Sequence, residues 1–166
     1  MTEANLTFNE LLDWIDAETE QWRGWFSRQP ASIWTLSAGT GRLATVQDLL
    51  HHVVVIDLRY GQRLAGLPVS TYEQEAVADP AELFTIAKRG QDLLRTWAAS
   101  ASPADLATVI EFQTISAGTQ RASKRKILGH TLMHHTRHMA QLATMLRQHG
   151  HPSDWSHDLL FSRALI

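Results

Sequence analysis

The chain has 166 residues, enough for a sizeable hydrophobic core, and we expect one domain spanning residues 1–166. It contains no cysteine, which excludes disulfides, thiolate-bound zinc and a cysteine nucleophile, so any metal ligands must be imidazole or oxygen. A formal net charge of −2 with 19% charged residues gives neither the basic stripe of a nucleic-acid-binding protein nor an acidic tail.

The first residues lack the basic region and the apolar run of a secretory signal, and no apolar stretch reaches the length of a membrane span. We therefore expect a cytoplasmic protein that acts on a small molecule and binds neither nucleic acid nor membrane.

Apolar side chains that recur at three- and four-residue steps predict four long helices. Each begins near a residue that can cap a helix and ends at a glycine or before a proline. The second start, Thr45-Val-Gln-Asp48, resembles a capping box with Asp in place of the usual Glu or Gln. The predicted helices cover residues 7–29, 45–66, 79–102 and 123–150.

The stretch from Leu106 to Thr119 is rich in β-branched residues and predicts a short hairpin or an ordered extended crossover before the last long helix. Four long helices with one extended crossover predict an all-α fold, a four-helix bundle. The tail from Ser153 to Ile166 is half apolar, so we expect it to pack on the helices or on a partner subunit.

The six tryptophans divide into two groups. Those with helical spacing favour the core or a dimer interface, and those near element ends could line the rim of a pocket. The first group is Trp14, Trp22, Trp25 and Trp97, and the second is Trp34 and Trp155.

His130, His134 and His138 lie at positions i, i+4 and i+8 of the predicted last helix, which is metal-ligand spacing. Three protein ligands rarely come from one helix, so a second element must contribute. The pair His51-His52 stands within an apolar run of the second helix, and neighbours on a helix diverge by about 100°. We favour His52 because it lies closer to the predicted buried stripe, although a hydrogen-bonded core histidine is the alternative reading of such a residue.

The segment Leu-Leu-His-His at residues 49–52, about eighty residues before His-x-x-x-His-x-x-x-His-x-x-Gln at residues 130–141, resembles the DinB/YfiT-like family of metal-dependent enzymes. The resemblance covers nearly the whole chain and implies a four-helix bundle with a three-histidine metal site. It assigns the metal to His52, His134 and His138. The family's usual His-His-Arg-Gly-Gln appears here as Arg-His-Met-Ala-Gln at residues 137–141, which keeps the ligand histidine.

Other residues are expected to support the ligands or to line the pocket. The resemblance places His130 one turn before the ligand pair, matches Gln141 to the family's glutamine and finds Asp57 where many members have an acid. Each ligand ring also needs a partner for its other nitrogen, for which Asp48, Asp57, Gln141 or backbone carbonyls are available. The pattern assigns no catalytic residue.

Three neutral imidazoles leave a divalent ion with its full charge and an open position, which is typical of a catalytic site. Zinc and nickel are the natural ions, followed by iron or manganese. The segment from His134 to His138 lacks the glutamate of the HExxH signature, which argues against a zincin-type peptidase.

Two classes of function follow. The first is a metal-dependent transferase that adds a thiol of the bacillithiol or mycothiol type to an electrophile, or a related thiol-dependent isomerase or metal-assisted hydrolase. Where such a thiol carries carboxylates, these could bind Arg59, Arg63 and Arg137; the alternative for these arginines is a solvated surface. The second class is non-catalytic: the metal clips the second and last helices together or serves a stress-response homodimer.

The sequence also suggests a surface metal site and two segments that set specificity. His149, His151 and His157 form a loose group after the last helix, which we interpret as an adventitious surface metal site. We expect the loop from Pro68 to Ala78 and the extended crossover to set substrate specificity.

Overall fold

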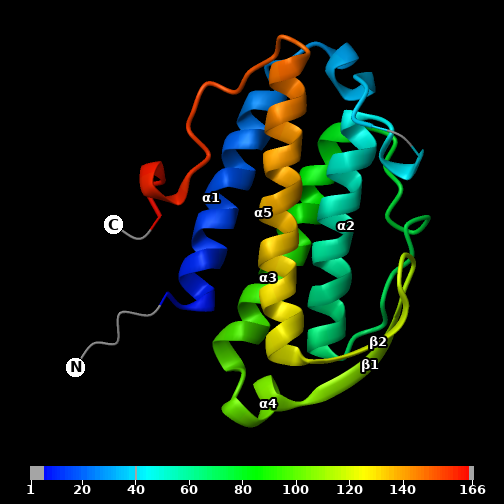
Figure 1. Ribbon diagram of the computed structural model, residues 1–166, viewed down its shortest axis with the longest axis vertical. Helices are drawn as coiled ribbons and strands as arrows, with labels where there is room; N and C mark the ends of the chain where they lie inside the picture. Colours follow the sequence, from blue (N-terminus) through cyan, green and yellow to red (C-terminus); the bar gives the residue numbers. More distant parts are fainter. Residues whose placement is uncertain (1–5, 40, 165–166) are drawn as a thin grey trace.

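The computed structural model describes residues 6–39 and 41–164, which form a mostly helical fold with one small sheet (Figure 1). Four long helices lie side by side: α1 (Phe8–Phe26), α2 (Val46–Ala65), α3 (Leu83–Ser100) and α5 (Lys124–Gln148). The smaller elements are a short helix α4 (Pro103–Ala107), strands β1 (Val109–Thr114) and β2 (Gly118–Ser123), and 3-10 helices η1 (Ala31–Thr35), η2 (Gly41–Leu43), η3 (Pro80–Glu82) and η4 (Leu159–Phe161). Within the described ranges, none of the helices combines the length and apolar character needed to cross a membrane.

Local sequence explains where the helices begin and end. The Thr45 side chain accepts a hydrogen bond from the Asp48 backbone N–H, and the Asp48 carboxylate accepts one from the Thr45 N–H, which completes the capping box at the start of α2. Gly66, with φ of 71°, ends α2 in the left-handed conformation that glycine adopts without strain. Ser123 caps α5 as the sequence predicts.

The segment between α3 and α5 corrects the sequence-based prediction. Ser102, Pro103 and Asp105 form a capping box with proline at the first turn, so Pro103 begins the short helix α4 instead of only ending the helix before it. The hairpin consequently lies later than predicted: β1 and β2 pair antiparallel from Val109–Ser123 to Thr114–Gly118. The fold is therefore not purely α, because a two-stranded sheet crosses from α4 to α5.

Helices α2 and α3 approach each other closely at Gly90. A Cβ atom there would lie 2.8 Å from the backbone nitrogen of Leu58, so only glycine fits. This contact fixes α2, which carries His51 and His52, against the helix behind it.

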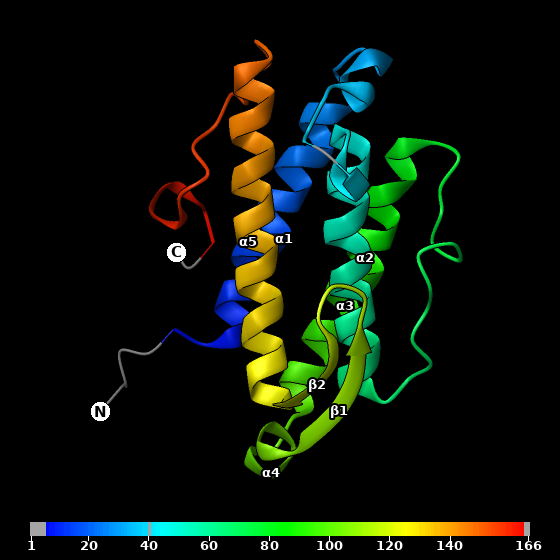
Figure 2. The same ribbon diagram turned by 45° about the vertical axis from the view of Figure 1, so that its right-hand side comes forward.

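The tryptophans of α1 belong to the core. Trp22 and Trp25 are buried, and Trp34 stacks on Phe26 with ring centroids 4.2 Å apart. The described part of the tail packs on α1, where Trp155 contacts Trp22 edge-on at 4.8 Å. Residues 165–166 of the predicted tail lie outside the described residues. Figure 2 shows the tail and the hairpin on opposite sides of α5.

Candidate metal centre

Three histidines from two helices converge between α2 and α5. One ring nitrogen from each of His52, His134 and His138 lies within 4.8 Å of the other two, and these are the three histidines that the sequence nominates. The Nε2 atoms of His52 and His134 are 3.2 Å apart, and the rings of His134 and His138 have centroids 4.5 Å apart. His134 and His138 come together because they are one turn apart on the same face of α5.

This arrangement fits a divalent ion. Zinc binds imidazole nitrogen at about 2.0–2.1 Å, so two nitrogens on one tetrahedral ion are separated by about 3.3 Å. The 3.2 Å between His52 and His134 matches that separation. In the described part of the chain no carboxylate joins the group, which leaves room for a ligand from outside the protein.

Burial keeps these imidazoles in the neutral form that binds metal. Desolvation, followed by repulsion from positive neighbours such as His138, lowers the pKa of His52 to about 4 and that of His134 to about 3. Burial also lowers the pKa of His138, although its hydrogen bond with Gln141 acts in the opposite direction.

Two of the rings are oriented by hydrogen bonds at Nδ1. His138 Nδ1 lies 3.0 Å from Gln141 Oε1, and because an amide oxygen only accepts, Nδ1 donates and Nε2 keeps its lone pair. His52 Nδ1 lies 3.1 Å from the Tyr72 hydroxyl. Such partners fix the tautomer and direction of a metal-binding imidazole.

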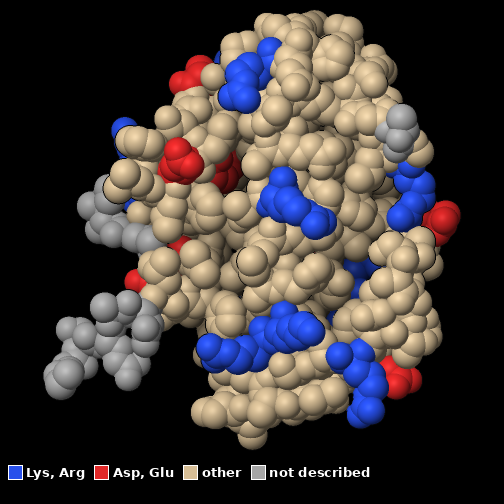
Figure 3. Space-filling model, in the orientation of Figure 1, with Lys and Arg blue, Asp and Glu red and all other residues tan. Residues whose placement is uncertain are grey.

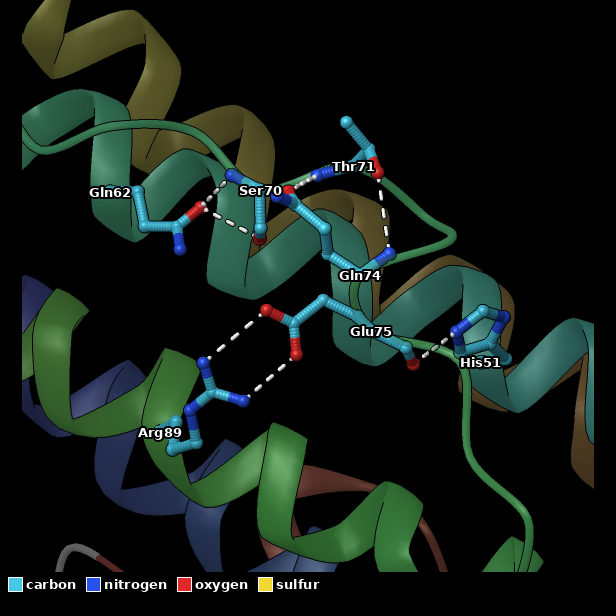
Figure 4. A network of polar contacts seen from close by, with 7 residues as sticks. All are labelled: His51, Gln62, Ser70, Thr71, Gln74, Glu75 and Arg89. Carbon is cyan, nitrogen blue, oxygen red and sulfur yellow. Dashed lines mark hydrogen bonds and ion pairs between the residues drawn. The ribbon is translucent and has the colours of Figure 1, made fainter.

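The sequence pattern did not single out Tyr72. It pointed only to the loop from Pro68 to Ala78, in which Tyr72 lies. Figure 4 shows how that loop is held. The Glu75 carboxylate accepts from Arg89 at 2.8 and 3.3 Å, and the Glu75 backbone carbonyl accepts from His51 Nε2 at 2.9 Å. His51 therefore anchors the loop that presents Tyr72, while its neighbour His52 faces the centre.

Arg137 lies directly against the histidine cluster. Its Nη2 donates to His138 Nε2 at 3.2 Å, the same nitrogen that Gln141 leaves free for a metal. An ion bound by His138 through Nε2 therefore requires Arg137 to turn away, and the released guanidinium would then be available to an anionic ligand.

The remaining predicted residues fall into different roles. Asp48 caps α2 and does not contact a histidine, because its carboxylate is occupied by Thr45. Asp57 is buried and lies 2.6 Å from Nδ1 of His135, so it orients a histidine outside the cluster. His130 lines the pocket, with its ring centroid 5.6 Å from that of His134, and desolvation lowers its pKa.

A cavity of about 480 Å³ opens beside the three histidines, between α2, α5 and the hairpin. Its lining is strongly cationic, although the whole chain carries a formal charge of −2. No Asp or Glu is among the described residues that line it. The cations are Arg42, Arg59, Arg63, Arg121, Lys126 and Arg137. Figure 3 shows Lys and Arg side chains over the lower half of this face, with acidic side chains nearer its margins.

Sequence reasoning did not single out several of these cations, because they do not lie on the helical turns that carry the histidines. Arg42 belongs to η2 and Arg121 to β2, and neither has a periodic pattern that links it to α5. Arg59 and Arg63 do line the pocket, and they also donate to the backbone carbonyls of Ser70 and Gln113. The two segments predicted to set specificity both contribute to the wall, through Tyr72 and through the hairpin.

Two other predictions are wrong. Among the described residues, the histidines after α5 do not come together as a group that could hold an ion: His149 Nε2 donates to the Ser37 carbonyl, while His157 contacts Glu18 and Ser153. Trp34 and Trp155 are not at the rim of this cavity, because Trp34 packs on the core and Trp155 Nε1 donates to Glu18.

Comparison with protein families places the chain in a known family. The sequence model of the DinB family matches residues 1–164, nearly the whole chain. A comparison with curated proteins finds no match.

Proposed function

Because this chain belongs to the DinB family, we propose that it is a divalent-metal-dependent enzyme of four-helix-bundle type whose metal is held by His52, His134 and His138. We propose further that it transfers a low-molecular-weight thiol that carries carboxylates, of the bacillithiol type, to an electrophile. Zinc or nickel is the expected ion, since three neutral imidazoles suit both.

The observation that carries this proposal is the position of the histidine group at a large cationic cavity. A purely structural metal needs four protein ligands and no access, whereas here three ligand side chains meet beside about 480 Å³ of open space. A metal that only clipped α2 to α5 would gain nothing from such a cavity. The arrangement therefore favours catalysis over the non-catalytic alternative.

The charge of the cavity narrows the class of substrate that it can bind. Six cationic side chains and no described carboxylate line it, so a neutral ligand would leave their repulsion unrelieved, while an anionic ligand removes it. Arginine binds carboxylates in a bidentate manner, and Arg42 and Arg121 have no hydrogen-bonding partner for their side chains among the described residues. A thiol with carboxylates thus fits better than an uncharged one.

A divalent ion bound here would supply a thiolate at neutral pH by lowering the pKa of the thiol. In the proposed reaction the thiol sulfur would form a bond to the electrophilic carbon, and the leaving group would depart with the electron pair of the bond that breaks. His130, whose pKa is lowered by desolvation and which lines the same cavity, would take the thiol proton. Arginines of the cavity would hold the carboxylates of the thiol.

We also retain the homodimer as a proposal. Leu160 and Phe161, in the described part of the tail, are exposed apolar side chains that a second subunit could cover. This part of the proposal is independent of the metal site.

Thiol transfer to 1-chloro-2,4-dinitrobenzene, followed by absorbance, tests the proposed activity. Zinc- or nickel-loaded protein should accelerate the reaction with bacillithiol, which carries carboxylates, more than with mycothiol, which does not. The His134→Ala variant should show no acceleration, and the His151→Ala variant, changed outside the cavity, should retain most of it. Equal rates for loaded wild type, metal-free wild type and His134→Ala would overturn the proposal.

A further inference from the structure

A serine, a histidine and a glutamate form a hydrogen-bonded chain between the tail and α1, on the side of α5 away from the hairpin (Figure 2). Ser153 Oγ lies 2.7 Å from His157 Nε2, and His157 Nδ1 lies 2.9 Å from Glu18 Oε2. None of the three residues lines the cavity beside the metal centre. A hydroxyl, an imidazole and a carboxylate linked in this order are the groups of the catalytic triad of serine hydrolases.

The hydrogen-bond partners fix the tautomer of His157. The Glu18 carboxylate accepts from His157 Nδ1, and it also accepts from Trp155 Nε1 at 3.2 Å. With Nδ1 as the donor, Nε2 of the neutral ring carries a lone pair and accepts from Ser153 Oγ. A histidine that acts as general base for a serine hydroxyl needs this tautomer.

Buried neighbours hold the acid and the base in place. Glu18 is 7% exposed, so its carboxylate meets His157 away from bulk water. The His157 ring stacks on the buried Trp22, with centroids 5.1 Å apart and ring planes 9° apart. Ser153 and His157 remain partly exposed, so a substrate can reach them. A buried acid, an oriented base and an accessible hydroxyl are what nucleophilic catalysis by serine requires.

A backbone N–H next to Ser153 can serve the negative charge that develops on a reacting carbonyl oxygen. In esterases with a serine nucleophile, the N–H of the residue after the serine donates to this oxygen. Here that residue is Asp154, and its N–H makes no hydrogen bond within the described residues. The Asp154 carboxylate accepts from Arg28 at 3.2 Å, which ties this part of the tail to the residues that follow α1.

We infer that Ser153, His157 and Glu18 form a second catalytic site, which hydrolyses an uncharged carboxylic ester. Ser153 Oγ bonds to the carbonyl carbon and gives its proton to His157 Nε2; the C–O bond of the ester then breaks, and the alcohol leaves with that proton. Water next attacks the acyl group and gives its proton to Nε2, and the acid departs as Oγ takes the proton back. Glu18 orients His157 and stabilises the imidazolium.

Charge and independence from the metal define this site further. The carboxylates of Glu18 and Asp154 lie beside the reacting groups and repel an anionic ester, which is the reverse of the cationic cavity at the metal centre. Side chains and water supply every group that the reaction uses. The inference therefore does not rest on the proposed function.

Covalent labelling of the full-length protein with phenylmethylsulfonyl fluoride tests the inference. This uncharged reagent sulfonylates an activated serine hydroxyl with loss of fluoride, and peptide mass spectrometry locates the label. We expect the label on Ser153, to the same extent before and after treatment with EDTA, which separates this site from the metal centre. EDTA-treated wild type should also hydrolyse 4-nitrophenyl acetate, and the labelled protein should lose this activity.

Variants of the three residues and one matched control complete the test. Ser153→Ala should abolish labelling and ester hydrolysis, whereas Ser156→Ala, at an exposed serine of the same segment, should behave like wild type. His157→Gln should slow labelling by roughly 100-fold or more, which is what a general base contributes. Glu18→Gln should slow it as well and should move the His157 Nδ1 proton resonance upfield. Melting temperatures show which variants keep the fold, and Ser153→Ala, at a partly exposed residue, should melt like wild type.

The inference is overturned if Ser153 of wild type is not labelled, if Ser153→Ala and Ser156→Ala hydrolyse the ester alike, or if folded His157→Gln is labelled at the wild-type rate. A role confined to anchoring the tail would also overturn it: Ser153→Ala would then melt at a lower temperature, while Ser153 of wild type would not react with the reagent.

Discussion

The Nε2 atoms of His52 and His134 lie 3.2 Å apart, although 82 residues of chain separate these residues. Two neutral imidazole nitrogens that face each other at this distance repel unless a proton or a cation lies between them. The fold therefore supplies two ligands of one site from α2 and α5, and His138 adds the third from the next turn of α5.

The pH dependence of metal binding should be weak near neutrality. An ion binds only the unprotonated imidazole, and a lowered pKa means that the metal-free site has already lost its protons at pH 6. With the pKa of His52 at about 4 and that of His134 at about 3, binding at pH 6 should release almost no proton from these two rings. Three histidines with ordinary pKa values would together release about two protons at that pH.

Calorimetry in two buffers of different ionisation enthalpy at pH 6 measures this release directly. A release of two or more protons would contradict the lowering of the histidine pKa values by burial. Affinity should fall only as the pH approaches the lowered pKa values, because protons then compete for the same nitrogens.

Removal of the Tyr72 hydroxyl should weaken metal binding. In the Tyr72→Phe variant His52 Nδ1 loses its partner at 3.1 Å, so the ring is no longer fixed in its tautomer and direction. The loss of such a partner lowers metal affinity by about 10–100-fold. Tyr60→Phe is the control, because Tyr60 lines the same cavity and its hydroxyl has no hydrogen bond to a histidine of the cluster. A competition titration with a chelator measures the metal affinity of both variants. Equal affinities for Tyr72→Phe and Tyr60→Phe would exclude this role for Tyr72.

The cationic cavity predicts a charge effect on thiol binding. Arg121→Ala removes a lining cation that has no hydrogen-bonding partner among the described residues, and it should raise KM for an anionic thiol several-fold at low salt while kcat changes little. Arg147→Ala, an equal charge loss at an exposed position of α5 outside the cavity, should leave KM unchanged. If both variants shift KM alike, the effect would come from net charge alone.

Gly90 should not tolerate a side chain. Alanine would place its Cβ 2.8 Å from the Leu58 nitrogen and 3.0 Å from its Cα, and both are backbone atoms that can move only if α2 and α3 separate. Such overpacking costs about 1–3 kcal/mol, against a gain of up to about 1 kcal/mol from the helix preference of alanine. Gly24→Ala meets only the end of the Arg28 side chain at 3.7 Å and should leave stability equal or higher. Urea unfolding measures the stability of both variants. A Gly90→Ala variant as stable as wild type would contradict this account.

The helices and the histidine group follow from local patterns that the sequence displays. Apolar periodicity and caps such as Thr45 and Ser123 place the long helices within a few residues. Spacing of four residues predicts that His134 and His138 share a face, and the apolar run around His52 predicts which of two neighbours turns inward.

The other features of the fold and the site depend on tertiary contacts, which a local sequence pattern does not reveal. Tyr72 reaches His52 only because Glu75 is held by Arg89 of α3 and His51 of α2. Asp57 pairs with His135 instead of a cluster histidine because the two side chains meet on another face of α5. The short helix α4 was missed because Pro103 stops one helix and begins the next.

Elemental analysis of purified protein is the most direct test of the three-histidine centre. We expect about one divalent ion per chain in wild type and in His151→Ala, which changes a histidine outside the cavity. His134→Ala and His138→Ala should lose it, and His52→Ala should lose most of it. A wild-type protein that is metal-free after expression in metal-replete medium and takes up neither added zinc nor added nickel would contradict the assignment.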